Sequence, residues 1–142
     1  MMPIINRGTW TRVFSFRTLI NRFIEKFKDE SPMQILSLGA GLDANYFYFE
    51  ESSELFRNNN VKYIEVDFPD ITAQKISVIK EHDSLQKLIS PDGISEYCSS
   101  EDTLMGPKYK LIPCDVREIE VFEEKLVQAN VDPTAATLVL SE

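Results

Sequence analysis

The chain has 142 residues, 43% of them hydrophobic and 27% charged, a composition typical of one globular domain with a buried core. Its net charge of −8 at pH 7 argues against DNA or RNA as a partner, because phosphates are neutralised by clustered Lys and Arg. The N-terminus shows no long apolar segment that would predict a signal peptide or a membrane span. We therefore expect a protein that binds neither nucleic acid nor membranes.

Cysteine and histidine are scarce, which excludes several kinds of site. Cys98 and Cys114 have no paired spacing and no nearby histidine, so we expect two reduced thiols and a cytoplasmic location. His82 is the only histidine, too few for a Ser-His-Asp triad or a histidine-based metal centre. The sequence predicts no metal site and identifies no catalytic residue.

Helical periodicity begins close to the N-terminus. Residues 1–11 are expected to be irregular, because Pro3 and Gly8 interrupt any pattern. From about residue 12 to residue 28 the apolar side chains, Leu19 among them, recur at intervals of three and four. This spacing predicts an amphipathic helix with one buried face.

A glycine turn follows the first predicted strand. Strand and turn cover residues 33–41 and end in Gly39-Ala40-Gly41, and Asp43 is the expected N-cap of a helix over 43–50. Glycine lets a backbone bend sharply and come close to a ligand, and a helix start offers unpaired N–H groups. Gly39 and Gly41 are therefore candidate cofactor-binding residues.

The rest of the chain alternates between strands and helices. Strands are predicted over 61–66, 109–114 and 137–140, and helices over 68–80, 84–89 and 118–129. Alternation of this kind is typical of an α/β fold whose parallel sheet is covered by helices. We therefore predict one domain with a sheet of about four parallel strands.

Polar residues and a glycine follow the carboxyl ends of these strands, where ligands bind in open parallel sheets. The four positions are Gly39, Asp67, Asp115 and Glu142. Asp67 can accept hydrogen bonds from ribose hydroxyls, and Asp115 from an adenine amino group, although each can instead be a helix N-cap. Glu142 either meets a cationic part of a ligand or is a solvated residue at the end of the sequence.

Two cofactors suit this arrangement. The segment 39–44 matches the loose G-x-G-x-x-A pattern of dinucleotides such as NAD. The carboxylate of Asp43 lies in that turn and disfavours a pyrophosphate. S-adenosylmethionine has no phosphate and carries a sulfonium cation, so the acidic surroundings favour it over NAD.

Five blocks of the sequence resemble the leucine carboxyl methyltransferase family, in the same order along the whole chain. They are Asn6-Arg7-Gly8 with Arg12-Val13, LGAGLD at 38–43, EVDFP at 65–69, SEDTL at 100–104, and Asp115-Val116-Arg117. The resemblance implies a Rossmann-like methyltransferase fold that uses S-adenosylmethionine, of which residues 1–142 form a partial domain. It also implies methylation of the C-terminal leucine carboxylate of the protein phosphatase 2A catalytic subunit, which would be the partner.

The same resemblance implies a role for individual residues. A C-terminal carboxyl group has a pKa of about 3.5, so it is already an anionic nucleophile at neutral pH and needs no histidine base. The donor-binding residues would be Arg12 for the donor's carboxylate, Gly39 for its methionine portion, Asp67 for the ribose, Asp115 and Val116 for the adenine, and Glu142, which would close the pocket.

Enzymes of this family are longer than this chain, and the apolar strand over 137–140 suits the middle of a sheet. If the protein ended there, that strand would be an open edge with uncovered apolar side chains. We therefore expect a fragment or short form that aggregates, or binds S-adenosylmethionine weakly, when purified alone. The alternatives are a non-catalytic remnant that binds the donor or the phosphatase, and a relative that acts in wybutosine-type tRNA modification.

Overall fold

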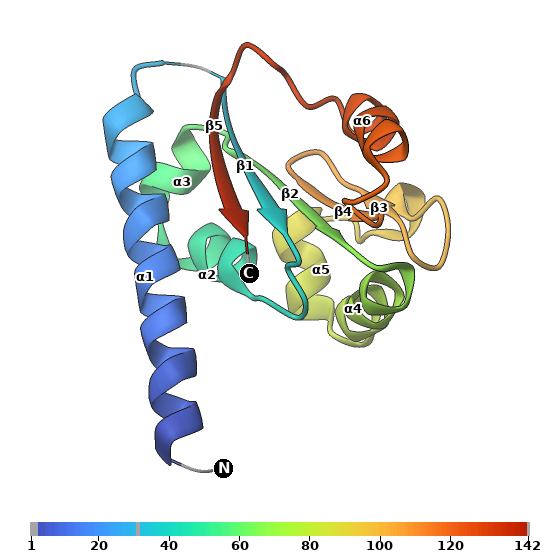
Figure 1. The fold of residues 1–142 in the computed structure, drawn as a ribbon, viewed down its shortest axis with the longest axis horizontal. Coiled ribbons are helices and arrows are strands. Elements are labelled where there is room, and N and C mark those ends of the chain that lie inside the picture. The colour runs from blue at the N-terminus through green and yellow to red at the C-terminus, as the bar shows by residue number, and fades with distance from the viewer. Residues whose placement is uncertain (1–2, 31, 142) are drawn as a thin grey trace.

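The strands lie in the order β3-β4-β2-β1-β5 in the computed structural model, which describes residues 3–30 and 32–141 (Figure 1). Their bounds are β1 Met33–Leu38, β2 Lys62–Asp67, β3 Leu104–Met105, β4 Tyr109–Pro113 and β5 Ala136–Ser141. β1 pairs in parallel with β2 and β5, and β2 pairs in parallel with β4. The short β3 is antiparallel to β4. This arrangement confirms the predicted α/β fold with a mainly parallel sheet.

Helices cover both faces of the sheet, because successive strand residues point to opposite sides. Ile35 and Tyr63 pack into a core with α1–α5, whereas the next residues, Leu36 and Ile64, pack under α6. In Figure 1, α1 and α6 lie on opposite sides of the strands. The helices are α1 Pro3–Phe27, α2 Asn45–Ser52, α3 Glu54–Asn58, α4 Pro69–Glu81, α5 Asp83–Ile89, the short 3₁₀ helix η1 Ser95–Tyr97, and α6 Ile119–Gln128.

The first helix begins at Pro3 rather than near residue 12, so the expected irregular start is wrong. Proline is tolerated in the first turn of a helix, where its missing N–H has no partner in any case. Gly8 lies exposed inside α1, and nothing lies within 4 Å of where a Cβ would be. The predicted buried face is confirmed at Ile20, Phe23 and Ile24, whereas Leu19, which was expected on the same face, is 47% exposed.

Two details of the strands and loops depart from the sequence-based expectation. Asp43 does not cap a helix, because α2 begins at Asn45 after Ala44, and Ala44 makes no side-chain cap. The β3 strand was not predicted, since two residues inside a long polar stretch carry no periodicity. The expected elements over 68–80, 84–89 and 118–129 are present as α4, α5 and α6.

The β5 strand lies at an edge of the sheet and pairs with β1 alone. Its burial alternates, since Leu140 is 3% exposed whereas Val139 is 55% exposed. The apolar run over 137–140 predicted a strand buried on both faces, and in this structure only one face is covered. Val139 is therefore an apolar side chain left uncovered on the face opposite the α1 core.

Gln34 joins β1 to the loop before β5. Its side-chain Nε2 donates to the Asp132 carbonyl at 2.7 Å and to the Thr137 hydroxyl at 2.8 Å, and its Oε1 accepts from the Asp132 N–H at 3.1 Å. Gln34 is only 2% exposed, so water cannot readily replace these bonds. The amide thus satisfies both backbone groups of Asp132.

Replacing Gln34 by leucine should lower the free energy of unfolding by about 1–3 kcal/mol, because the Asp132 N–H and C=O lose their partners. Urea denaturation followed by circular dichroism measures this change. The matched control is Gln128→Leu on the exposed side of α6, expected to stay within about 0.5 kcal/mol of the unsubstituted protein. Equal stability of Q34L and Q128L would show that Gln34 does not hold this loop.

Candidate functional site

The turn after β1 takes a backbone conformation that glycine alone adopts easily. Gly39 has a φ of 69° and Gly41 a φ of 55°, both in the left-handed region. The Gly39 N–H donates to the Val66 carbonyl at 2.9 Å, which continues the β1–β2 pairing into the turn. The Asp43 N–H donates to the Ala40 carbonyl at 3.0 Å and closes the turn. No atom lies within 4 Å of where a Cβ of Gly41 would be, so its surface is open.

Asp67, the last residue of β2, is fixed against this turn. Its Oδ2 accepts from the Gly41 N–H at 2.7 Å, and its Oδ1 accepts from the Phe68 N–H at 2.7 Å. Phe68 is the N-cap of α4 and makes no side-chain cap, so Asp67 does not cap that helix. A carboxylate has about four acceptor positions, so further hydrogen bonds to a ligand remain possible on both oxygens.

Asp115 lies beside Asp67 at the same end of the sheet. The Cys114 N–H donates to the Asp67 carbonyl at 2.8 Å, which places the residues after β4 next to the end of β2. A small cavity of about 130 Å³ opens between these two strand ends. It brings together four predicted positions, and its lining consists of Gly39, Val66, Asp67, Phe68, Cys114, Asp115, Val116 and Arg117.

Arg117 holds the Asp115 carboxylate in place. The guanidinium donates from Nε to Oδ1 at 2.9 Å and from Nη2 to Oδ2 at 2.6 Å, and the Arg117 backbone N–H donates to Oδ1 at 3.0 Å. These bonds lower the pKa of Asp115 to about 2. The residue before α6 is Glu118, so Asp115 does not cap that helix with its side chain. The sequence interpretation named Arg117 in a block shared with the family but assigned it no role, although its spacing two residues from Asp115 is typical of such a turn.

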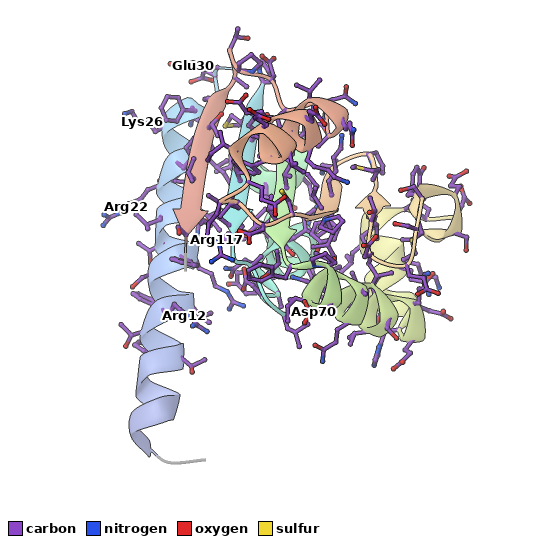
Figure 2. All side chains as sticks on the ribbon, turned by 45° about the vertical axis from the view of Figure 1, so that its right-hand side comes forward. Arg12, Arg22, Lys26, Glu30, Asp70 and Arg117 are labelled. Carbon is purple, nitrogen blue, oxygen red and sulfur yellow. The ribbon has the colours of Figure 1, made fainter. Side chains whose placement is uncertain are left out.

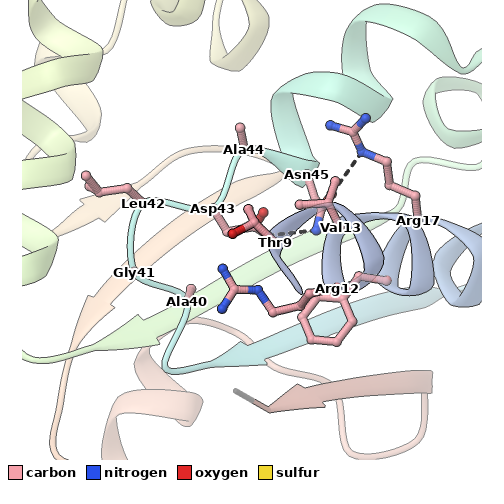
Figure 3. A pocket seen from close by; sticks show the side chains of 11 residues that line it. Thr9, Arg12, Val13, Arg17, Ala40, Gly41, Leu42, Asp43, Ala44 and Asn45 are labelled. Atoms are coloured by element: carbon pink, nitrogen blue, oxygen red, sulfur yellow. Dashed lines mark hydrogen bonds between the residues drawn. The ribbon is translucent and has the colours of Figure 1, made fainter. Parts of the chain in front are cut away.

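A second, larger cavity lies on the other side of the turn, between the turn and α1. Its volume is about 380 Å³, and Figure 3 shows the Arg12 guanidinium reaching toward Ala40 and Gly41. Asp43 and Asn45 line the same cavity. The lining residues are Thr9, Arg12, Val13, Phe16, Arg17, Ala40, Gly41, Leu42, Asp43, Ala44 and Asn45.

Arg17 connects α1 to the turn through Asn45. Its Nε donates to the Asn45 Oδ1 at 3.3 Å, and the Asn45 Nδ2 donates to the Asp43 carboxylate at 2.9 Å (Figure 3). The Arg17 guanidinium also stacks over the Tyr48 ring, 3.5 Å from its centroid. The sequence interpretation did not identify this chain of contacts.

A buried ion pair beneath the turn was also missed. Lys75 of α4 donates to the Glu65 carboxylate of β2 at 2.5 Å, and the Tyr109 hydroxyl donates to the same Glu65 oxygen at 2.8 Å. Burial raises the pKa of Glu65, and the Lys75 ammonium and the Tyr109 hydroxyl oppose that rise. The available signal was a glutamate between the apolar residues Ile64 and Val66, since charged side chains are almost never fully buried without a partner.

The remaining sequence-based expectations concern Glu142, metal binding and membrane-spanning segments. Glu142 lies outside the described residues. Within residues 3–30 and 32–141, no group of three or more His, Cys, Asp or Glu side chains is arranged to hold a metal ion. No helix in the same part of the chain is long and apolar enough to cross a membrane.

Comparison with known sequences adds an independent observation. The sequence model of the leucine carboxyl methyltransferase family matches residues 1–142. A protein of Bos taurus named leucine carboxyl methyltransferase 1 is 35% identical over 147 residues, and an Arabidopsis thaliana homolog of that enzyme is 32% identical over 140. Each alignment covers 99% of this chain but only 41% and 40% of those proteins.

A third relative carries a different name. A tRNA wybutosine-synthesizing protein 4 of Candida albicans is 32% identical over 135 residues, which is 92% of this chain and 19% of that protein. The chain therefore spans about two fifths of the two carboxyl methyltransferases and about a fifth of this longer relative. The family match covers the whole sequence, including the glycine turn and both strand-end aspartates. The chain belongs to the leucine carboxyl methyltransferase family.

Proposed function

We propose that this chain binds S-adenosylmethionine across the glycine turn and is the donor-binding part of a carboxyl O-methyltransferase. The observation that carries the proposal is the position of Asp67, whose two oxygens are oriented by backbone N–H groups while the residue lines an open cavity. Carboxylates at the ends of β2 and β4 suit hydroxyl and amino donors, and the Asp43 carboxylate in the glycine turn would repel a pyrophosphate.

Each cavity would hold one part of the donor. Arg12 would pair with the donor's carboxylate on the α1 side of the turn, where Gly41 leaves the backbone open. On the other side, Asp67 would accept from the ribose, and Asp115 with Val116 would contact the adenine. Gly39, which lines the cavity beside Asp67, would contact the methionine portion, and Glu142 remains a proposed closing residue.

When bound, S-adenosylmethionine supplies an activated methyl group. The acceptor we propose is the C-terminal leucine carboxylate of the protein phosphatase 2A catalytic subunit, as the relatives' names suggest a leucine carboxyl group. Such a carboxylate has a pKa of about 3.5 and is ionised at neutral pH, so no side chain has to remove a proton. The work of this chain is then to orient the donor and limit the access of water.

Two alternatives rest on specific observations. The similarity to a tRNA wybutosine-synthesizing protein supports a tRNA-linked acceptor, but the net charge of −8 gives this chain little attraction for RNA. The two cavities beside the glycine turn equally support a donor-binding role without turnover. Both free cysteines are compatible with the cytoplasmic location that we propose. A methyl-transfer assay with the phosphatase subunit and with tRNA separates these functions.

Donor binding is tested by titrating isotope-labelled protein with S-adenosylmethionine and with NAD in parallel NMR experiments, which also detect weak affinity. We expect the Gly39 and Gly41 amide signals to shift with S-adenosylmethionine and to stay in place with NAD. The variant Asp67→Asn should weaken donor binding by roughly tenfold or more, because an amide cannot accept from both backbone N–H groups.

The matched control is Asp70→Asn, which removes the same charge three positions further along the chain, in the exposed first turn of α4 (Figure 2). Its donor affinity should remain within about twofold of the unsubstituted protein. Shifts with NAD alone would favour a dinucleotide site, and full affinity in D67N would remove Asp67 from the binding site.

The role of Arg117 is tested through the titration of Asp115. Because Arg117 stabilises the ionised carboxylate, Asp115 should stay ionised until the pH falls toward its pKa of about 2. In Arg117→Gln the pKa should rise toward the ordinary value of about 3.9. The stabilising contribution of the pair is therefore present above about pH 4 and is lost as the pH falls through the folded pKa.

The measurement is carboxyl-carbon NMR over the acidic range. Arg22→Gln is the control, since Arg22 is exposed on α1 and points away from the sheet (Figure 2). It should leave the Asp115 titration unchanged. If Asp115 titrated at about pH 4 in the unsubstituted protein, its contact with Arg117 would not persist in solution.

A further inference from the structure

The buried Lys75 contacts the glycine turn as well as its ion-pair partner. Lys75 is 4% exposed, and its ammonium donates to the Asp43 backbone carbonyl at 2.5 Å in addition to the Glu65 carboxylate. Glu65 is fully buried and accepts from the Tyr109 hydroxyl on the same oxygen, Oε2. Three elements, β2, β4 and α4, are thus joined to one carbonyl of the turn.

A buried ion pair by itself is a weak source of stability. Removing two charges from water costs free energy that their attraction repays only partly, and apolar residues of similar volume often stabilise a core equally well. Here the second Glu65 oxygen, Oε1, is buried and has no hydrogen-bond partner among the described residues. The pair is therefore a weak source of stability, and its distinguishing contact is the bond from Lys75 to the turn.

The Asp43 carbonyl is linked to the donor-binding residues through few backbone atoms. The Asp43 N–H closes the turn onto Ala40, and Gly41 lies between these two residues. Gly41 in turn donates its N–H to the Asp67 carboxylate at 2.7 Å. Holding the Asp43 carbonyl therefore restricts the direction of the Gly41 N–H, and with it the orientation of Asp67.

The two sides of Asp43 are held differently. Its carboxylate faces the α1 cavity and accepts from the Nδ2 of Asn45, a side chain that is 1% exposed and also accepts from Arg17. Its carbonyl faces the core and is held by a buried ammonium that no ligand can reach. A group placed in this way can orient the turn without touching a ligand.

We propose that Lys75 is a positioning residue for the candidate site: with Glu65 as its counter-charge, it fixes the glycine turn and, through the Gly41 N–H, the Asp67 carboxylate. The identity of the bound ligand rests on the proposed function, but the effect on Gly41 does not. The proposal can therefore be tested with and without a donor.

The decisive variant is the double substitution Lys75→Met with Glu65→Gln. Lys75→Met alone leaves a buried carboxylate without its partner and should lower the urea midpoint clearly, whereas the double variant removes both charges and should recover most of that loss. Neither variant can donate to the Asp43 carbonyl. Lys80→Met, on the exposed side of the same helix, is the matched control.

The first readout is the hydrogen-exchange rate of the Gly41 amide, measured by NMR without any ligand. In the double variant it should rise by roughly tenfold or more, while the amide of Ile35 in β1 stays within about twofold. An unchanged Gly41 rate overturns the proposal. Equal acceleration of Gly41 and Ile35 also overturns it, because that result indicates a general loss of stability.

The second readout is the affinity for S-adenosylmethionine at equal folded fraction. We expect the double variant to bind at least about fivefold more weakly than K80M, even though its stability has recovered. Full affinity in the double variant overturns the positioning role. If the unsubstituted protein binds no donor, the proposed function fails, and the Gly41 exchange rate still decides the role of Lys75.

Discussion

One hydrogen bond, from the Gly41 N–H to the Asp67 carboxylate, connects the two parts of the candidate site. It joins the turn after β1 to the end of β2, two strands that are already parallel neighbours. The bond requires Gly41 at a φ of 55°, a conformation that a residue with a Cβ adopts only at a cost of about 1–2 kcal/mol. Sheet register, glycine conformation and carboxylate orientation therefore depend on one another, and a change in any of them changes the site.

The fold could be predicted from sequence because its signals are local and repeated. Strands buried on both faces appear as short apolar runs, and α4 begins with Pro69 in its first turn, so the α/β alternation was visible without coordinates. The beginning of α1 could not be predicted in this way. Pro3 and Gly8 lower the helix propensity locally, yet the helix continues through both residues. Local propensity is a weak guide where a long helix packs against a sheet through only part of its length.

The candidate site was predictable at the strand ends and hidden elsewhere. Asp67 and Asp115 follow predicted strands, so topology alone brings them to one edge, and the structure places both beside the same cavity. Lys75 and Glu65 are ten residues apart, on a helix and a strand, and no periodicity marks them as partners. The linkage from Arg17 through Asn45 to Asp43 spans α1 and the turn, and only the tertiary arrangement shows it.

The charged groups near the turn fall into two sets, a buried ion pair beneath it and accessible side chains that line the two cavities. Lys75 and Glu65 neutralise each other in the core, so they add little net field at the turn surface. The charged side chains that line the cavities are Arg12, Arg17 and Asp43 on the α1 side, and Asp67, Asp115 and Arg117 on the other. Because Arg117 also compensates Asp115, Asp67 is the strand-end carboxylate whose charge lacks a cationic side-chain partner among the described ion pairs. A ligand that spans the turn would therefore find a cation for an anionic group near Arg12 and an acceptor for hydrogen-bond donors near Asp67.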